Sequence, residues 1–434
     1  MHTVSSRRRV VIVGGGFGGL SAAQALARAP VDVTLIDRHN YHLFQPLLYQ
    51  VATAGLSPAD IASPIRGVLH RQKNAFVMLA RVTGVDPDRR VVMTDEGDVA
   101  YDALIIATGA KHAYFGRDGW ERHAPGLKKI EDATELRRRI LLAFEKAEIV
   151  KDPAERRRLL TFAVIGGGPT GVEMAGAIAE LARTALAADF RAIDPRMTRV
   201  VLIEAGPRIL PSFHPQSSAT AAAGLRGLGV EVEAGAPVTA VDGEGVEVAG
   251  RRIESRTIVW AAGVRASPAA RWLGAEADGA GRVKVAADLS VPGRPNIFVI
   301  GDAAHVAGPD GRPLPGVAPV AKQQGRHAAR QIGLAPELRA PFRYRDYGAM
   351  ATIGRRKAVA DLGRVRLSGS LAWLIWCVAH VYFLIGFRNR MSVAANWAWS
   401  YVTYQRGPRL ITGSGEEHPL APEQAPAAAL RRSA

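Results

Sequence analysis

Short runs of β-branched residues alternate along the chain with glycine-rich turns and helix-forming stretches. A strand is predicted over residues 10–13, a helix over 20–28 and a second strand over 31–36, which is the order of a βαβ unit. A second copy has a strand at 162–165, a helix from Val172 to about Leu186 and a strand at 199–203. This internal repeat of about 150 residues predicts two α/β domains of similar construction.

Three further predicted strands end in small residues. They cover residues 104–107, 257–260 and 296–300, and the residues that follow them are Thr108-Gly109, Ala261-Ala262-Gly263 and Gly301-Asp302. The composition shifts after Pro341, because four of the seven tryptophans lie between positions 373 and 399. Residues 411–434 have little apolar patterning, so we predict a disordered tail there.

Each βαβ unit carries a GxGxxG motif between its first strand and its helix. In the first copy, Gly14, Gly16 and Gly19 permit a tight turn, close approach of a pyrophosphate, and close packing of helix on strand. Asp37 ends the next strand, 23 residues after Gly14, where it can accept hydrogen bonds from a ribose. A glycine-rich turn without a ligand is the alternative, and the combination of strand, helix and acid disfavours it.

The second motif consists of Gly166, Gly168 and Gly171, with Glu204 as the acid. The spacing of 38 residues from Gly166 to Glu204 requires an enlarged helix or an insertion around residues 189–197. A carboxylate at this strand end repels a 2′-phosphate, so it favours NADH over NADPH. Arg208 follows closely and weakens that preference.

Two such folds in one chain indicate an NADH-binding domain inserted into a split FAD-binding domain. We interpret Gly301-Asp302 as the returning FAD segment, with Asp302 on the ribityl chain and the following helix directed at the flavin. The predicted division is 1–110 for the first part of the FAD domain, 111–160 for a connecting helical segment, 161–263 for the NADH domain, 264–340 for the second part of the FAD domain, 341–410 for a C-terminal anchoring and dimerisation region, and 411–434 for the tail.

Charge and cysteine content restrict the partners. The formal net charge of +16 favours an anionic partner, and the chain has no nucleic-acid-binding signature, so a membrane surface is preferred to nucleic acid. A solvated, arginine-rich surface without a partner is the alternative. Cys377 is the single cysteine, which excludes a redox dithiol within the chain and a Cys-ligated metal site. No metal-ligand set is evident.

Residues 371–387 form an apolar run that is followed by Arg388-Asn389-Arg390 and by a second helical stretch up to Tyr404. In that stretch Met391, Ala395, Trp399 and Val402 share one face. Tryptophan and arginine favour the membrane interface, so we predict two helices that lie on the bilayer as a monotopic anchor. A buried core helix or dimer contact, and a single spanning helix, are the two alternatives.

With these features the sequence resembles type II NADH dehydrogenase, the single-subunit, non-pumping NADH:quinone oxidoreductase. The most specific stretches are residues 44–53, 166–173, 318–325 and 383–390. The resemblance implies that Glu173 lies beside the nicotinamide and quinone pockets and that Gln323 lies at the quinone headgroup. Many relatives carry a further glutamine where this chain has Pro319. The resemblance also implies FAD contacts at Gly18, Arg38, Gln45, Val82, Thr108 and Gly109, and nicotinamide contacts at Ala262 and Gly263.

The activity implied by the resemblance is hydride transfer from NADH to non-covalently bound FAD, then two-electron reduction of menaquinone or ubiquinone without proton pumping. It further implies a homodimer on the cytoplasmic face of the cell membrane. Two other functions remain open from the residues alone. One is a soluble NADH-dependent ferredoxin or rubredoxin reductase, which the apolar segment after residue 371 disfavours. The other is a redox-sensing flavoprotein without turnover.

Overall fold

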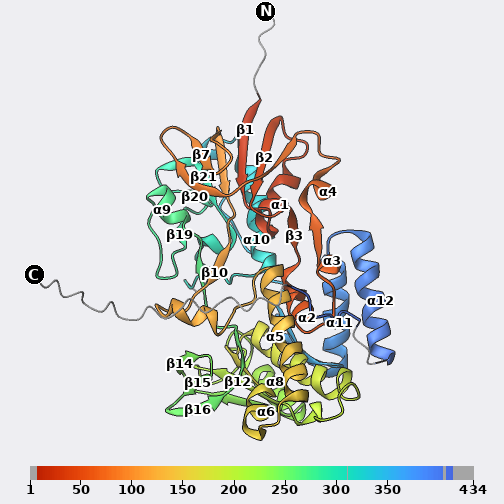
Figure 1. Ribbon diagram of the computed structural model, residues 1–434. Helices are drawn as coiled ribbons and strands as arrows, with labels where there is room; N and C mark the ends of the chain where they lie inside the picture. Colours follow the sequence, from red (N-terminus) through yellow and green to blue (C-terminus); the bar gives the residue numbers. More distant parts are fainter. Residues whose placement is uncertain (1–6, 310, 404–406, 414–434) are drawn as a thin grey trace, which may run out of the picture.

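The computed structural model describes residues 7–309, 311–403 and 407–413 (Figure 1). It is an α/β fold with two separate parallel sheets, and the predicted βαβ strands are confirmed at both places. The predicted disordered tail, residues 411–434, lies outside the described residues from position 414 onward.

The first sheet has the strand order β20-β21-β9-β1-β2-β5, with all neighbours parallel except β20 and β21. Alternate residues of its central strand β1 enter two different cores, because helices cover one face and an antiparallel layer covers the other. Because β21 pairs with β9, segments that are far apart in the sequence lie in one sheet. The strands are β1 (Arg8–Val13), β2 (Val31–Asp37), β5 (Ala75–Leu79), β9 (Ala103–Ile106), β20 (Ser290–Val291) and β21 (Arg294–Val299).

Two helices pack closely beside this sheet, α1 (Phe17–Ala25) and α10 (Ala318–Gln331). A Cβ built on Gly325 of α10 would lie 2.2 Å from the backbone oxygen of Gly18 in α1. Only glycine permits this approach, so the α10 backbone is held against the first turn of α1. The helix predicted directly after Gly301-Asp302 is only a single 3-10 turn, Gly301–Ala303, and α10 begins at Ala318.

The second sheet has the order β13-β12-β11-β17, all parallel. Its strands are β11 (Thr161–Ile165), β12 (Arg199–Glu204), β13 (Val230–Ala234) and β17 (Thr257–Trp260), and the helices around it are α5 (Ile130–Ile149), α6 (Pro153–Leu159), α7 (Pro169–Glu180) and α8 (Pro215–Gly227). A separate antiparallel sheet consists of β14 (Val238–Asp242), β15 (Gly245–Val248) and β16 (Arg251–Glu254).

The insertion predicted before β12 is confirmed. Helix α7 ends at Glu180 and continues as a π-helical turn, Leu181–Ala185, and the next strand begins only at Arg199. The carboxylate of Glu148 on α5 accepts the backbone N–H groups of Arg191, Ala192 and Ile193 at 2.8–3.1 Å. This contact attaches the inserted segment to α5. It also gives a hydrogen-bond acceptor to three backbone amides of that segment that would otherwise have none within the protein.

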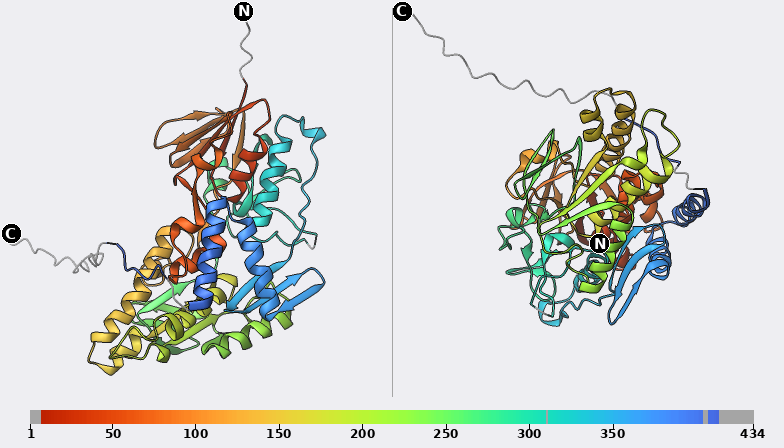
Figure 2. Two further views of the ribbon diagram at one scale, coloured as in Figure 1. Left: turned by 90° about the vertical axis from the view of Figure 1, so that its right-hand side faces the viewer. Right: turned by 90° about the horizontal axis from the view of Figure 1, so that it is seen from below.

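The C-terminal part consists of a three-stranded antiparallel sheet and two helices that lie next to each other on one side of the molecule (Figure 2). The strands are β23 (Ala349–Gly354), β24 (Lys357–Leu362) and β25 (Val365–Ser368), and the helices are α11 (Gly369–Phe383) and α12 (Phe387–Thr403). In the described part of the chain, no helix combines the length and the apolar character needed to cross a membrane.

Short elements connect these layers. They are β3 (Tyr41–Leu43), α2 (Leu48–Ala52), α3 (Pro58–Ile61), β4 (Ala62–Pro64), α4 (Ile65–Leu69), β6 (Val82–Asp86), β7 (Val91–Thr94), β8 (Val99–Ala100), β10 (Ala110–His112), β18 (Val264–Ala266), α9 (Ala269–Leu273), β19 (Val283–Lys284) and β22 (Ala304–His305). Among them, α2 packs against both α5 and α7, so the segment after the first glycine motif reaches the second sheet.

Candidate active site

The first glycine motif forms a cradle whose inner positions are closed to any side chain. Gly14 has a φ of +105°, and a Cβ on it would lie 2.4 Å from the oxygen of Ala107. A Cβ on Gly19 would lie 1.8 Å from the oxygen of Gly14. Gly16 differs, because no atom lies within 4 Å of the position of its Cβ. Gly16 therefore faces open space at the N-terminus of α1, where a phosphate can approach the unpaired N–H groups.

Asp37 closes the back of this cradle. Its carboxylate accepts the N–H of Gly15 at 2.5 Å and the N–H of His39 at 2.7 Å. Each carboxylate oxygen has two acceptor positions, so one position on each oxygen stays available for a ribose hydroxyl. The cradle and its acid thus fit the adenosine diphosphate part of a dinucleotide such as FAD.

The second motif repeats this geometry. A Cβ on Gly171 would lie 1.8 Å from the oxygen of Gly166, and the Cβ position of Gly168 has no atom within 4 Å. Glu204 accepts the N–H of Gly167 at 2.6 Å and that of Gly206 at 2.7 Å. The residues present therefore fit a second dinucleotide.

Arg208 is held away from the ribose side of the second cradle. Its guanidinium donates hydrogen bonds to three backbone carbonyl oxygens, those of Leu210, Pro211 and Phe213, at 2.7–3.1 Å. These bonds engage three of the five N–H donors of Arg208, which leaves fewer donors for a 2′-phosphate. The weakening effect expected from Arg208 is therefore small in this conformation.

The carboxyl ends of β9 and β21 bring two predicted FAD contacts together. The Thr108 hydroxyl lies 2.5 Å from the Ser267 hydroxyl, and Gly109 has a φ of +66°. The N–H of Gly301 donates to the side-chain oxygen of Gln324, a buried residue of α10, at 2.6 Å. Asp302 lies 3.7 Å from the ammonium of Lys128. Because β9 and β21 are parallel neighbours, these residues share one edge of the first sheet.

The remaining predicted contacts are more dispersed. Gly263 has a φ of +78° and lies against Phe115, and Ala262 precedes it at the end of β17. Gln45 begins a 3-10 turn that leads into α2, and Val82 begins β6 with a half-buried side chain. Arg38 is exposed directly after β2.

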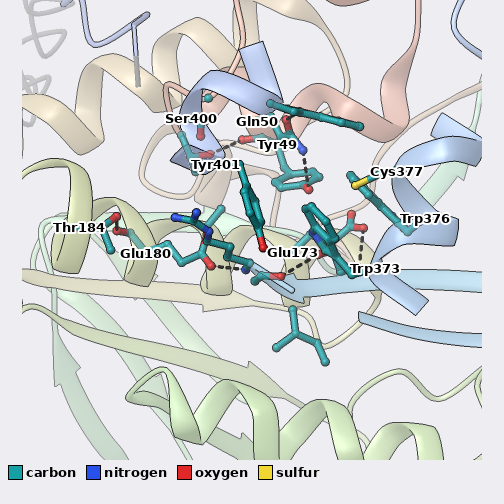
Figure 3. Close-up of a pocket in the computed structure, with 18 residues that line it drawn as sticks. Tyr49, Gln50, Glu173, Glu180, Thr184, Trp373, Trp376, Cys377, Ser400 and Tyr401 are labelled. Carbon is teal, nitrogen blue, oxygen red and sulfur yellow. Dashed lines mark hydrogen bonds between the residues drawn. The ribbon is translucent and has the colours of Figure 1, made fainter. Parts of the chain in front are cut away.

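Glu173, in the first turns of α7, lies in a pocket with a volume of about 150 Å³ (Figure 3). Its side chain is 9% exposed, and the N–H of Thr352 in β23 donates to it at 3.3 Å. Burial raises the pKa of Glu173 to about 8, although the Thr352 N–H and the Trp376 side chain oppose the rise. The raised pKa favours the protonated carboxyl near neutral pH, which can give its proton to a bound acceptor and then be protonated again.

A hydrogen-bonded chain runs from the same pocket into α12. The indole N–H of Trp397 donates to the Gln50 oxygen at 2.7 Å, and the Gln50 amide donates to the Tyr49 hydroxyl at 2.9 Å. Burial and the charge of Glu173 raise the pKa of Tyr49 well above its usual value, so the hydroxyl keeps its proton. Tyr49, Gln50 and Glu173 line one pocket, shown together in Figure 3.

The tryptophan-rich helices also form walls of this pocket, which the sequence alone did not reveal. Trp376 of α11 is 2% exposed, and Trp373, Cys377 and Trp397 line the pocket with it. The sequence does contain a signal for an inward face of α12, because Asn389, Val393 and Trp397 follow one another at a helical spacing of four residues. These three residues define a face opposite to that of Met391, Ala395 and Trp399.

Helix α12 is fixed to the first part of the chain by polar contacts. Ser392 donates to a carboxylate oxygen of Asp60 at 2.6 Å, and Asn396 donates to the other oxygen at 3.3 Å. The Asn389 amide donates to the oxygen of Ala62 at 3.0 Å. The pocket walls on α12 therefore have a defined position relative to α3 and β4.

Gln323 is placed on α10, and its amide is held by the backbone of Arg345. Its oxygen accepts the Arg345 N–H at 3.0 Å, and its nitrogen donates to the Arg345 oxygen at 2.9 Å. One lone pair and one amide proton remain for a ligand. Gln323 does not line the Glu173 pocket, so the structure does not bring the two residues predicted at the quinone into one cavity.

Comparison with known proteins agrees with this arrangement. The family model described as pyridine nucleotide-disulphide oxidoreductase matches residues 8–325, and the one described as NDH2 C-terminal domain matches residues 347–403. The chain is 49% identical to the type II NADH:quinone oxidoreductase Ndh of Mycobacterium tuberculosis, over 94% of this chain and 90% of that protein. It is 32% identical to the type II NADH:quinone oxidoreductase of Staphylococcus aureus, over 84% and 92%.

A solved structure shows the same fold. NDH2 from Plasmodium falciparum in complex with NADH superimposes with a TM-score of 0.86 at 22% identity, and the match covers 93% of this chain and 99% of that one. Both the glycine cradles and the C-terminal helices fall inside the matched family regions. The chain therefore belongs to the type II NADH:quinone oxidoreductases.

Proposed function

We propose that the first cradle holds FAD and the second holds NADH, in a dinucleotide domain inserted into a split flavin domain. The FAD site consists of Gly14, Gly16, Gly18, Gly19, Asp37, Arg38, Gln45, Val82, Thr108, Gly109, Gly301 and Asp302, and the NADH site of Gly166, Gly168, Gly171, Glu204, Ala262 and Gly263. FAD held there would supply the hydride-accepting and electron-passing chemistry between NADH and the quinone. The chain orients both dinucleotides and excludes water.

The preference for NADH is assigned to Glu204 together with the restrained Arg208. We expect Glu204→Gln to raise the KM for NADH by about tenfold, because a charged acceptor of the ribose is lost. The same variant should also narrow the difference in kcat/KM between NADH and NADPH. Steady-state kinetics with both nucleotides check this, and Asp37→Asn is the matched control. That variant changes the equivalent acid of the other cradle, so it should lower FAD retention and leave the nucleotide preference intact.

Quinone reduction needs two electrons and two protons, and NADH supplies the electrons and one proton as hydride. We assign delivery of the other proton to Glu173, whose buried carboxyl is neutral at pH 7. Tyr49 and Gln50 keep the pocket polar beside it. Gln323 lies outside the Glu173 pocket, so its contact with the quinone headgroup stays a prediction from the resemblance, in which Arg345 would hold the amide in place.

The observation that carries the proposal is the presence of two matching dinucleotide cradles and a buried, proton-holding carboxyl on the helix of the second cradle. The direct test uses the purified, FAD-loaded protein. NADH should bleach its yellow flavin band, and a soluble menaquinone or ubiquinone analogue should restore the band within one turnover. A band that NADH bleaches but that no quinone restores would favour a redox sensor or a reductase for another acceptor.

We propose further that α11 and α12 lie on the cytoplasmic face of a cell membrane, from which the quinone reaches the site. The outward faces of both helices support this. Leu374 and Val378 of α11 are 54% and 62% exposed, and Met391, Trp399 and Val402 of α12 are exposed as well. Such an apolar face, flanked by arginines, suits an interfacial anchor. The homodimer that the resemblance implies stays a prediction, which sedimentation of the detergent-solubilised protein tests.

The double substitution Leu374→Gln and Val378→Gln tests this membrane contact. We expect binding to lipid vesicles to weaken at least tenfold, because two apolar side chains no longer enter the interface. Turnover with a water-soluble quinone should stay within twofold, since neither side chain lines the pocket. Vesicle co-sedimentation and NADH oxidation are measured on the same preparations. Unchanged vesicle binding would place the membrane contact elsewhere.

A further inference from the structure

Helix α10 approaches the turn between α11 and α12 (Figure 2), and three cationic residues belong to these elements. They are Lys322 and Arg326 of α10 and Arg390 of α12, and we call them the basic corner. Lys322 and Arg326 lie one helical turn apart on α10, and the rings that Lys322 and Arg390 contact, Phe383 and Tyr382, have centres 5.2 Å apart. The charges of both arginines lower the pKa of Lys322. Within the part of the chain that the structure describes, none of the three forms an ion pair with a carboxylate.

Aromatic rings lie against two of these charges, those of Lys322 and Arg390. The Lys322 ammonium lies 5.2 Å from the ring centres of both Phe17 and Phe383. The Arg390 guanidinium lies 5.9 Å from the ring of Tyr382, and its Nε donates to the oxygen of Leu384 at 2.8 Å. Cation–π contacts hold the cations in place without neutralising them. The corner therefore presents positive charge that no described residue compensates.

The outer edge of the basic corner is apolar and open to solvent. Tyr382 and Phe387 are 67% and 78% exposed, and Arg326 and Arg390 are exposed beside them. These aromatic side chains continue the outward faces of α11 and α12. A ligand that satisfies the whole surface must have both an anionic group and an apolar part.

We propose that the basic corner binds the phosphate of an anionic phospholipid headgroup. The phosphate would accept hydrogen bonds from the planar guanidinium groups of Arg326 and Arg390, above the ammonium of Lys322. The acyl chains would follow the exposed rings toward the apolar face of the hairpin. This inference rests on the proposed seating of α11 and α12 on a membrane, and it adds one defined lipid site to it.

The site should respond to pH through Lys322. Burial, and then the two arginines, lower the pKa of Lys322 to about 8. A bound phosphate favours the charged amine, so by linkage the affinity rises as pH falls through about 8 and declines above it. Burial lowers the pKa of His42 on β3 and of His380 on α11 to about 4, so both stay neutral in this range.

The experiment measures binding of the full-length, FAD-loaded protein to vesicles of phosphatidylcholine alone and of phosphatidylcholine with phosphatidylglycerol. We expect the double variant Arg326→Gln and Arg390→Gln to bind the anionic vesicles about thirtyfold more weakly, with an unchanged affinity for the neutral ones. The matched control is Arg364→Gln with Arg366→Gln. It removes the same charge from exposed positions at β25 and should change the affinity less than threefold.

A separate arm uses Lys322→Met, which should flatten the dependence of anionic-vesicle binding on pH between 7 and 9. Equal losses in both double variants would overturn the site in favour of general surface charge. Equal binding of the wild type to both vesicle types would also overturn it, while keeping the membrane seating. No vesicle binding at all would contradict the proposed contact of α11 and α12 with a membrane. Inorganic phosphate could also displace the protein from the anionic vesicles at a concentration about tenfold below that of the lipid. That result would identify a soluble anion as the ligand and overturn the lipid assignment.

Discussion

We expect Glu173→Gln to lower NADH:quinone turnover by about a hundredfold and to leave the FAD content unchanged. The amide has nearly the same shape as the protonated acid, but it cannot give up a proton, and proton transfer by a positioned group is worth at least this factor. Stopped-flow measurements separate the two half-reactions. Reduction of the flavin by NADH should stay close to the wild-type rate, and reoxidation by quinone should become slow.

The matched control is Glu180→Gln, which changes a second carboxylate of the same pocket two helical turns away. Glu180 binds the backbone of Arg355, and we expect its variant to keep turnover within about threefold. A Glu173→Gln enzyme with wild-type reoxidation would remove Glu173 from the catalytic site. Slow reoxidation in both variants would indicate that the pocket has lost its shape.

The same substitution changes how stability depends on pH. The native state holds a proton on Glu173 up to a pKa of about 8, whereas the unfolded chain releases it near the ordinary value of 4.5. Between these values the native state binds more protons, so the free energy of unfolding of the wild type falls as pH rises. Glu173→Gln removes this slope. By pH 8 its free energy of unfolding should exceed that of the wild type by up to about 5 kcal/mol, which urea titrations at pH 5 and pH 8 measure.

Alanine at the open glycine of each cradle separates the two dinucleotide sites. Gly168→Ala should raise the KM for NADH by more than a hundredfold in a protein that stays yellow, because the methyl group enters the space of the pyrophosphate and nothing else. Gly16→Ala should give a folded but colourless protein. Both Cβ positions have no protein atom within 4 Å, so neither variant overpacks the fold.

Gly119→Ala is the control for these two variants, since its Cβ position is also open and lies outside both cradles. It should keep both the colour and the KM. The absorbance ratio at 450 and 280 nm reports FAD, and thermal unfolding reports the fold. Colour in Gly16→Ala equal to that of the control would contradict the assignment of the first cradle to FAD.

The repeated βαβ units were predictable because their signals are local. The strand, the glycines and the acid of each unit fall within about 40 residues, and steric limits at Gly14 and Gly166 leave little freedom in how they fold. The exposed face of α12 was predictable for a similar reason, since helical spacing alone relates Met391, Ala395 and Trp399. Both predictions needed no knowledge of which distant segments meet.

The pocket could not be predicted because its walls come from five separated segments. Glu173 is buried by Thr352 and Trp376, which lie far along the chain, and Gln50 meets Trp397 across most of the sequence. The tryptophans were assigned to the membrane by composition, which cannot tell the inner side of a helix from the outer. The contact between Gln323 and Arg345 could not be predicted from the sequence either, because it depends on the path of the chain beside α10 after residue 340.

On α11 just over half a turn of helix separates Trp376, which faces the carboxyl of the pocket, from Val378, which faces outward. On α12 the same holds for Trp397 and Trp399. If α11 and α12 lie on a bilayer as proposed, a tilt that a thicker or stiffer bilayer imposes on their outer faces would shift the indole rings on their inner faces. Turnover in vesicles should therefore vary with acyl-chain length even when quinone concentration in the lipid is held constant.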